Sequence, residues 1–237
     1  MSFYEELSRY YDEIFPVDGS EMAFVAEQLA GADTLLDIGC GTGNKTVHCA
    51  GSAREVVAVD LDAGMIARAG MANARPNIRY EVLDMRAVGE HFRGRVFGGA
   101  MCLGNTLVHL DGPAEVGAFL QDVYGLLAPG GALVIQILNY DRILRDNVRD
   151  LPPLDSEHVL FERAYRPDGE KLRFLTRIIL KQSGRSFDND VLLYPLRREE
   201  LAGRLTGAGF RSLAWYGSYK GGPLEDSSFA AIAVCEK

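Results

Sequence analysis

Five apolar runs, separated by segments of helical length, organise the first 140 residues of the chain. They cover residues 35–38, 55–60, 78–84, 96–105 and 132–138. Runs of this length between turn signals are typical of buried strands. Pro129-Gly130-Gly131 ends the helix before the last run, because proline and glycine both interrupt helices. Strands that alternate with helices predict an α/β fold with a parallel sheet and right-handed crossovers.

The two ends of the chain follow other patterns. An aromatic-rich helix over 4–15 precedes Pro16, and apolar and charged residues alternate after 158, as in strands with one buried face. Pro167-Asp168-Gly169-Glu170 is a turn signal between two of these strands. The C-terminal elements predicted are strands at 159–166, 172–180 and 187–194, a helix at 197–208 ended by Gly209, and strands at 210–215 and 228–234.

Composition and charge narrow the class of protein. The chain has 237 residues, 47% of them hydrophobic, which is enough for one domain with a sizeable core. No apolar stretch is long enough to span a bilayer, and the first six residues lack the basic and apolar regions of a signal peptide, so we expect a cytoplasmic protein. A net charge of -8 argues against a nucleic-acid substrate. The locally basic segment 163–185 is interpreted as a solvated surface.

Cysteine and histidine spacing predicts neither a disulfide framework nor a metal site. The cysteines show no C-x-x-C spacing and are interpreted as buried thiols in a reducing compartment. The histidines show no ligand spacing either. The residues concerned are Cys40, Cys49, Cys102 and Cys235, and His48, His91, His109 and His158.

The segment Leu35-Leu-Asp-Ile-Gly-Cys-Gly-Thr-Gly43 carries the strongest functional signal. Its three glycines allow a tight turn and a close approach of the backbone to a ligand, and Thr42 onward is predicted to start a helix. Asn44 stands where the dinucleotide fingerprint requires glycine, and Asp37 suits a cationic ligand better than a pyrophosphate. Asp60 follows about 20 residues later, the usual distance for a carboxylate that binds ribose hydroxyls.

This segment resembles motif I of class I S-adenosylmethionine-dependent methyltransferases. The resemblance covers residues 35–138 well and the rest more loosely. It implies a Rossmann-like, seven-stranded methyltransferase sheet with helices on both faces, ending in an antiparallel hairpin at the sheet edge, plus a small antiparallel β insertion after strand five. The chain would be a single domain, 1–237. Its parts would be N-terminal lid helices (1–30), the cofactor-binding core (31–139), the substrate-side insertion (140–195), and a C-terminal helix and hairpin (196–237).

The resemblance also implies S-adenosylmethionine as the cofactor and S-adenosylhomocysteine as its product. Asp84 would contact the adenine amine and Met85 would pack on the ring, while Tyr10 and Tyr11 would close the methyl pocket, where aromatic faces favour a sulfonium. The cofactor-binding residues implied are Tyr10, Asp37, Gly39, Cys40, Gly41, Gly43, Asp60, Leu61, Met65, Asp84, Met85, Leu103 and Gly104.

The end of the fourth run narrows the acceptor. It lacks the Pro-Pro pair that nucleobase-amine methyltransferases show there, and Cys102–Leu110 instead resembles glycine and sarcosine N-methyltransferases. An arginine from the insertion would anchor a carboxylate substrate, since it can bind both oxygens. His109 is open between a base or anchor and a packed helix-face histidine. The catalytic candidates are Asn105, His109, Tyr11 and Tyr140, and the substrate-binding candidates are Asn139, Arg142, Arg163 and Arg177.

The sequence therefore favours methyl transfer to a small-molecule acceptor, with an amine preferred over a hydroxyl or carboxyl group. Two other classes are weighed against it. Asn44 and Asp37 oppose a NAD-binding oxidoreductase, and a non-catalytic cofactor-binding module would require a blocked methyl pocket. We expect no metal, membrane or nucleic-acid partner, and leave monomer and homodimer both open.

Overall fold

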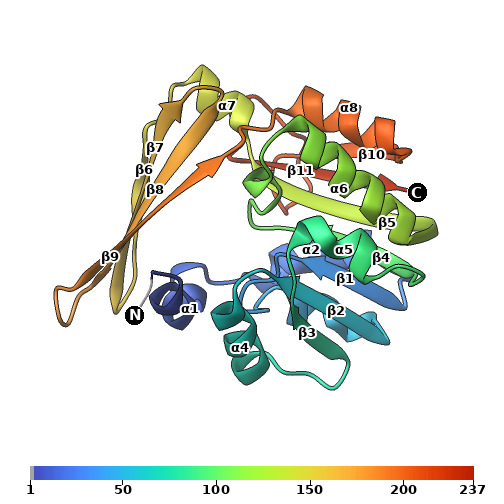
Figure 1. Ribbon diagram of the computed structural model, residues 1–237, viewed down its shortest axis with the longest axis horizontal. Helices are drawn as coiled ribbons and strands as arrows, with labels where there is room; N and C mark the ends of the chain where they lie inside the picture. Colours follow the sequence, from blue (N-terminus) through green and yellow to red (C-terminus); the bar gives the residue numbers. More distant parts are fainter. Residues whose placement is uncertain (1–2) are drawn as a thin grey trace.

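The computed structural model describes residues 3–237 and contains two sheets (Figure 1). The larger sheet has seven strands in the order β10-β11-β5-β4-β1-β2-β3, with β1 to β5 parallel and β11 antiparallel to β5. Its strands are β1 (Thr34–Ile38), β2 (Glu55–Asp60), β3 (Ile78–Val82), β4 (Phe97–Cys102), β5 (Leu127–Leu138), β10 (Arg211–Tyr216) and β11 (Ala230–Glu236). The predicted sheet and its edge hairpin are confirmed.

Helices cover both faces of this sheet, because alternate strand residues point to opposite sides. Leu35 packs in the cluster that holds α2, and Leu36 packs in the cluster that holds α5, α6 and α8. The helices are α1 (Phe3–Ile14), α2 (Gly19–Gln28), α3 (Thr46–Cys49), α4 (Ala63–Ala72), α5 (Val88–His91), α6 (Pro113–Leu126), α7 (Tyr140–Arg145) and α8 (Arg198–Ala208), with short 3-10 turns at Ala50–Ser52, Met85–Ala87 and Leu107–His109. Residues 1 and 2 of the predicted lid segment lie outside the described part.

The smaller sheet is antiparallel and follows β5, as expected, but it has four strands where three were predicted. They are β6 (Asp150–Asp155), β7 (Val159–Asp168), β8 (Lys171–Leu180) and β9 (Ser186–Leu193). The missed strand, β6, contains Pro152 and Pro153, which favour a loop; it is an edge strand, where missing backbone donors are tolerated. Figure 1 shows this sheet beside the larger one, with α1 between its lower end and α4.

Two predicted helix boundaries are wrong. Helix α6 ends at Leu126, and Pro129-Gly130-Gly131 lies inside β5, where the register with β4 shifts. The helix after the glycine turn begins at Thr46 instead of Thr42, because the Thr42 and Asn44 side chains bind α1 instead of capping a helix. Gly209, with φ of 108°, ends α8 as predicted.

All four cysteines are buried and free, which confirms the prediction that they are buried thiols. Over residues 3–237, none of the helices combines the length and hydrophobicity that crossing a bilayer needs.

Candidate functional site

The glycine turn lies at the carboxyl end of β1 and leaves no room for side chains. Gly39, Gly41 and Gly43 have φ of 75°, 57° and 73°, a region that L-residues rarely adopt. A Cβ on Gly39 would collide with Thr106, and one on Gly43 would collide with Tyr80. The turn is held to β2, since the amides of Gly39 and Cys40 both donate to the Val59 carbonyl, at 2.8 and 3.0 Å.

Asp37 is a carboxylate buried directly below this turn, with 3% of its surface exposed. The Thr46 hydroxyl donates to its Oδ2 at 2.6 Å. Burial nevertheless raises the pKa of Asp37 to about 7, against the opposing effects of Thr46 and Lys45. A cationic ligand above the turn would stabilise the ionised form.

Asp60 ends β2 next to the same turn. Its Oδ2 accepts from the Gly41 amide and its Oδ1 from the Asp62 amide, both at 2.9 Å. Burial raises the pKa of this carboxyl as well. Leu61 follows it with 66% of its surface exposed, so an apolar side chain stands open beside a carboxylate. A ribose with an attached planar base suits that pair of surfaces.

Asp84 and Met85 stand one strand further along, after β3. Arg86 binds both oxygens of Asp84, with Nη2 to Oδ2 at 2.6 Å, and this ion pair lowers the pKa of Asp84. Asp84 also caps the Met85–Ala87 turn through the Arg86 amide. An adenine amine would therefore share this carboxylate with Arg86. Met85 is half-buried against the main core.

Helix α1 covers the glycine turn, and one of its two predicted tyrosines faces it. The Tyr11 ring lies 3.5 Å from the position of a Cβ on Gly41, and its burial, with Asp60 next in effect, raises the pKa of the hydroxyl. Tyr10 instead stacks on His158 of the smaller sheet, because neighbouring helix residues point about 100° apart. Met65 is buried beneath α1. Tyr10 and Met65 both make packing contacts with other parts of the chain, and their cofactor contacts stay predictions.

Asn105 joins the carboxyl ends of β4 and β5. Its Nδ2 donates to the Tyr140 hydroxyl at 3.0 Å, and its Oδ1 accepts from the Leu138 amide at 2.9 Å. Asn105 adopts φ of 69°, which asparagine tolerates better than most residues. Gly104 donates its amide to Gln136 Oε1 at 2.8 Å, and Leu103 is buried in the core on the α2 side. Asn105 and Tyr140 therefore stand together at the sheet edge next to the glycine turn.

A row of polar side chains crosses the inner face of the smaller sheet. Arg163, Thr176 and Asn189 are paired across β7, β8 and β9. The inward-facing residues that flank this polar row along the strands belong to the main core on one side. On the other side they pack with α1. The polar row thus lies between two apolar clusters, at the level where α1 meets the end of the larger sheet.

Several buried polar atoms around this row have no hydrogen-bond partner in the described chain. They are Arg163 Nε, Thr176 Oγ1, the Tyr165 hydroxyl and Arg142 Nε. The Tyr165 hydroxyl lies in electrostatic contact with Tyr140, Arg142 and Arg163 but makes no hydrogen bond of normal geometry. Leaving a buried polar group unpaired costs about 1–3 kcal/mol. A polar ligand would remove that cost.

Three of the predicted substrate-binding and catalytic residues lie outside this group of polar side chains. Asn139 caps α7 and donates to the carbonyls of Glu225 and Ser228, so its amide is already committed. Arg177 lies on the outer face of the smaller sheet and pairs with Asp188 at 2.6 Å. His109 is solvent-exposed in the turn after β4 and makes no side-chain hydrogen bond within residues 3–237; partial desolvation lowers its pKa.

The sequence analysis did not identify Tyr165 and Thr176, which strand alternation alone does not single out. Their side chains share a face with Phe161 and Ile178, as the pairing of β7 with β8 shows. The available signal was a polar residue on the apolar face of a strand. This signal can be recognised only when the register of the neighbouring strands is known.

The residues around the glycine turn fit S-adenosylmethionine. The buried Asp37 and the partly buried Asp60 lie beside a turn that a Cβ on Gly39 or Gly43 would obstruct, and desolvation raises the pKa of both carboxyl groups. The ligand would bring a sulfonium and an ammonium to this place.

Comparison with known proteins agrees with this geometry. A family model described as "Methyltransferase domain" matches residues 35–131. The glycine/sarcosine/dimethylglycine N-methyltransferase of Actinopolyspora halophila is 29% identical over 225 residues, which cover 92% of this chain and 39% of that protein. A dTDP-3-amino-3,6-dideoxy-alpha-D-glucopyranose N,N-dimethyltransferase of Streptomyces fradiae is 31% identical over 55% of this chain and 52% of its own length. The chain thus spans only part of these two relatives.

Among solved structures, an S-adenosylmethionine-dependent methyltransferase from Clostridium acetobutylicum superposes with a TM-score of 0.81. The match covers 98% of each chain at 18% identity, so it establishes the fold alone. Among the curated relatives that match, N-methyltransferases predominate.

Proposed function

We propose that this chain, which belongs to the class I S-adenosylmethionine-dependent methyltransferases, methylates an amino group of a small molecule that also carries an oxyanion. The N-methyltransferases among its relatives support the amine, and they include enzymes named for amino acids and for an amino sugar. The oxyanion is supported by the polar residues around Tyr140, namely Arg142, Arg163, Tyr165 and Thr176, which we call the acceptor side.

One observation carries the proposal: the Tyr165 hydroxyl next to Tyr140, and the Nε atoms of Arg163 and Arg142 near it, have no hydrogen-bond partner in the described chain, while Arg163 Nη2 donates to the Pro152 carbonyl at 2.9 Å. Guanidinium groups bind the two oxygens of a carboxylate, or two oxygens of a phosphate, with matched geometry. Thr176 adds a hydroxyl that can donate or accept. An acceptor whose oxyanion meets the arginines would place its other end toward Asn105 and the glycine turn.

The protein's own task in this reaction is alignment and the exclusion of water. Bound S-adenosylmethionine supplies an electrophilic methyl group on a sulfonium. Asp37 lies on the side of its positive charge, Asp60 on the side of its ribose, the glycine turn lets it approach the backbone, and Tyr11 covers the turn from α1. Holding the nucleophile in line with the methyl group is the main source of rate in such a displacement.

The raised pKa values of Tyr140 and Tyr165 favour an amine over an alcohol as the methyl acceptor. Burial raises the pKa of Tyr140 well above its usual value and the pKa of Tyr165 to about 12, so neither hydroxyl is a base near neutral pH. A neutral amine needs no strong base, whereas an alcohol needs help to lose its proton.

Matched acceptor pairs test the proposal. The purified protein is incubated with S-adenosylmethionine and either an α-amino acid or the α-hydroxy acid of the same skeleton, and an amino sugar phosphate is compared with the sugar phosphate. We expect S-adenosylhomocysteine and an N-methyl product from the amine member of a pair. Turnover of the hydroxy member alone would overturn the amine, and turnover of uncharged amines as readily as charged ones would overturn the oxyanion. A parallel titration with NAD separates the cofactor from the acceptor question.

A further inference from the structure

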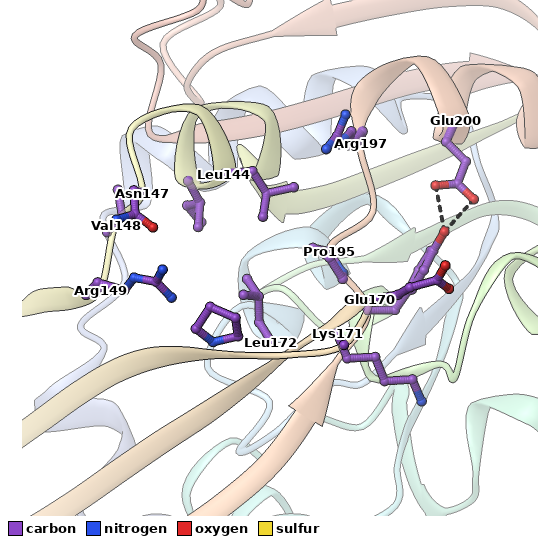
Figure 2. A pocket seen from close by; sticks show the side chains of 14 residues that line it. Leu144, Asn147, Val148, Arg149, Glu170, Lys171, Leu172, Pro195, Arg197 and Glu200 are labelled. Atoms are coloured by element: carbon purple, nitrogen blue, oxygen red, sulfur yellow. Dashed lines mark hydrogen bonds between the residues drawn. The ribbon is translucent and has the colours of Figure 1, made fainter.

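A second cavity lies away from the glycine turn, where α7, the β7–β8 turn and the start of α8 meet (Figure 2). Its volume is about 430 Å³, within the range of small-molecule sites. Ile143 and Leu172, both buried, give it an apolar floor. Nothing in the methyl-transfer chemistry uses this cavity.

Two arginines of the wall have no protein partner. Arg149 follows α7 and Arg197 precedes α8, and neither guanidinium makes a hydrogen bond, ion pair or ring contact within residues 3–237. Figure 2 shows the two residues on different segments, at opposite sides of the cavity. Unpaired guanidinium groups beside an apolar surface are suited to an anion that carries an apolar body.

Two of the three other charged residues of the wall, Glu200 and Lys171, already have partners. Both oxygens of Glu200 accept from the Tyr194 hydroxyl, at 2.8 and 2.9 Å. Lys171 pairs with Asp111 at 2.9 Å, and Figure 2 shows its side chain pointing away from Arg149. Glu170 lies on the Tyr194 side and contributes to the raised pKa of that hydroxyl. The wall therefore holds three cationic side chains, of Arg149, Lys171 and Arg197, against two carboxylates, of Glu170 and Glu200.

We infer that this cavity is a second ligand site, which binds a small organic anion, a carboxylate or a phosphate monoester, with an apolar body. Arg149 and Arg197 supply positive charge on two sides of the cavity for the anionic group, and the Ile143–Leu172 floor packs on the apolar body. The site is separate from the acceptor donors described above, since Arg149 and Arg197 take no part in that cluster. It does not depend on which acceptor the protein methylates.

Titration of the full chain with model anions tests this inference without any activity assay. Phenyl phosphate, benzoate and inorganic phosphate are titrated against the ¹⁵N-labelled protein, followed by the Nε–Hε resonances of arginine. We expect saturable shifts for Arg149 and Arg197, with an aromatic anion binding more tightly than inorganic phosphate because of the apolar floor. Whichever of phenyl phosphate and benzoate binds more tightly identifies the anionic group that the cavity prefers.

Variants decide the outcome. Arg149→Ala and Arg197→Ala should each weaken binding of the aromatic anion about tenfold, the effect of losing one charge-assisted hydrogen bond. Arg93→Ala is the control, since Arg93 is an exposed arginine without a side-chain partner in the described chain and lies on the segment before β4. Unchanged affinity for S-adenosylhomocysteine shows that each variant is folded. Shifts that never saturate, or equal weakening by Arg93→Ala, would overturn the site.

Discussion

The Thr46 hydroxyl donates a hydrogen bond to Asp37 Oδ2 at 2.6 Å, and both side chains are buried beneath the glycine turn. This single bond does not compensate the carboxylate for the loss of water, so the pKa of Asp37 is about 7. The folded protein without ligand thus holds a group that binds a proton far more tightly than the unfolded chain does, where an aspartate titrates near about 3.9. A cationic cofactor reverses that preference.

Cofactor affinity should therefore depend on pH. Because the pKa of Asp37 is raised in the folded state, protonation of this carboxyl stabilises the fold without cofactor. That contribution to the free energy of unfolding is complete below about pH 4 and is lost as the pH rises through about 7. S-Adenosylmethionine favours the ionised carboxylate, so binding should tighten about tenfold between pH 5.5 and pH 7. Calorimetric titration at several pH values measures this change. Asp37→Asn, which still accepts from Thr46, should show a flat profile; an equally steep profile in that variant would assign the effect to another group.

Substitution at the first glycine of the turn should be costly for two separable reasons. Gly39→Ala would combine an unfavourable φ of 75° with a collision against Thr106. Gly94→Ala is the matched control, because Gly94 has φ of 85° and open space around its Cβ position. Chemical denaturation should show a loss of about 1–2 kcal/mol for Gly94→Ala, the cost of the left-handed conformation, and a clearly larger loss for Gly39→Ala. Equal losses would mean that Thr106 moves aside freely.

Contacts between α1 and the turn should control how long the cofactor stays bound. The Thr42 hydroxyl donates to Asp12, and Asn44 Nδ2 donates to the Phe15 carbonyl at 3.2 Å. Asp12→Ala removes the first contact, so α1 should open more often and release of S-adenosylhomocysteine should be several times faster. Stopped-flow displacement measures the rate. Glu5→Gln changes an exposed position of the same helix and should leave the rate within twofold; a similar acceleration there would attribute the effect to helix stability instead.

The sheet and the cofactor side could be predicted from the sequence because both depend on local patterns. The run from Leu35 to Gly43 encodes a strand, a turn that requires glycine, and a buried acid within nine residues. The length of the following helix could not be predicted, since Thr42 bonds to Asp12, which lies 30 residues away in the sequence.

The acceptor side was only partly predictable, because its chemistry depends on strand register. Arg163 and Arg177 look alike in the sequence, each in an alternating apolar and charged strand. The register of β7 with β8 puts Arg163 opposite Thr176 and Arg177 opposite Glu162, so their side chains point to different faces. A slip by one residue would exchange them. Asn139 shows the same limit, since the carbonyls that its amide binds come from residues 225 and 228.

These two arginines provide the sharpest test of the acceptor side. Arg163 Nε is buried without a partner near Tyr165, whereas the exposed Arg177 pairs with Asp188. Arg163→Gln should raise the KM for the acceptor at least about tenfold, because one charge-assisted hydrogen bond to the oxyanion is lost, and should leave the affinity for S-adenosylmethionine unchanged. Arg177→Gln breaks an exposed ion pair worth about 1 kcal/mol or less and should leave both constants unchanged. Steady-state kinetics with an acceptor found in the matched-pair screen measures both variants. A rise in KM for Arg177→Gln equal to that for Arg163→Gln would place the acceptor on the outer face of the smaller sheet and refute the site proposed around Arg163 and Tyr165.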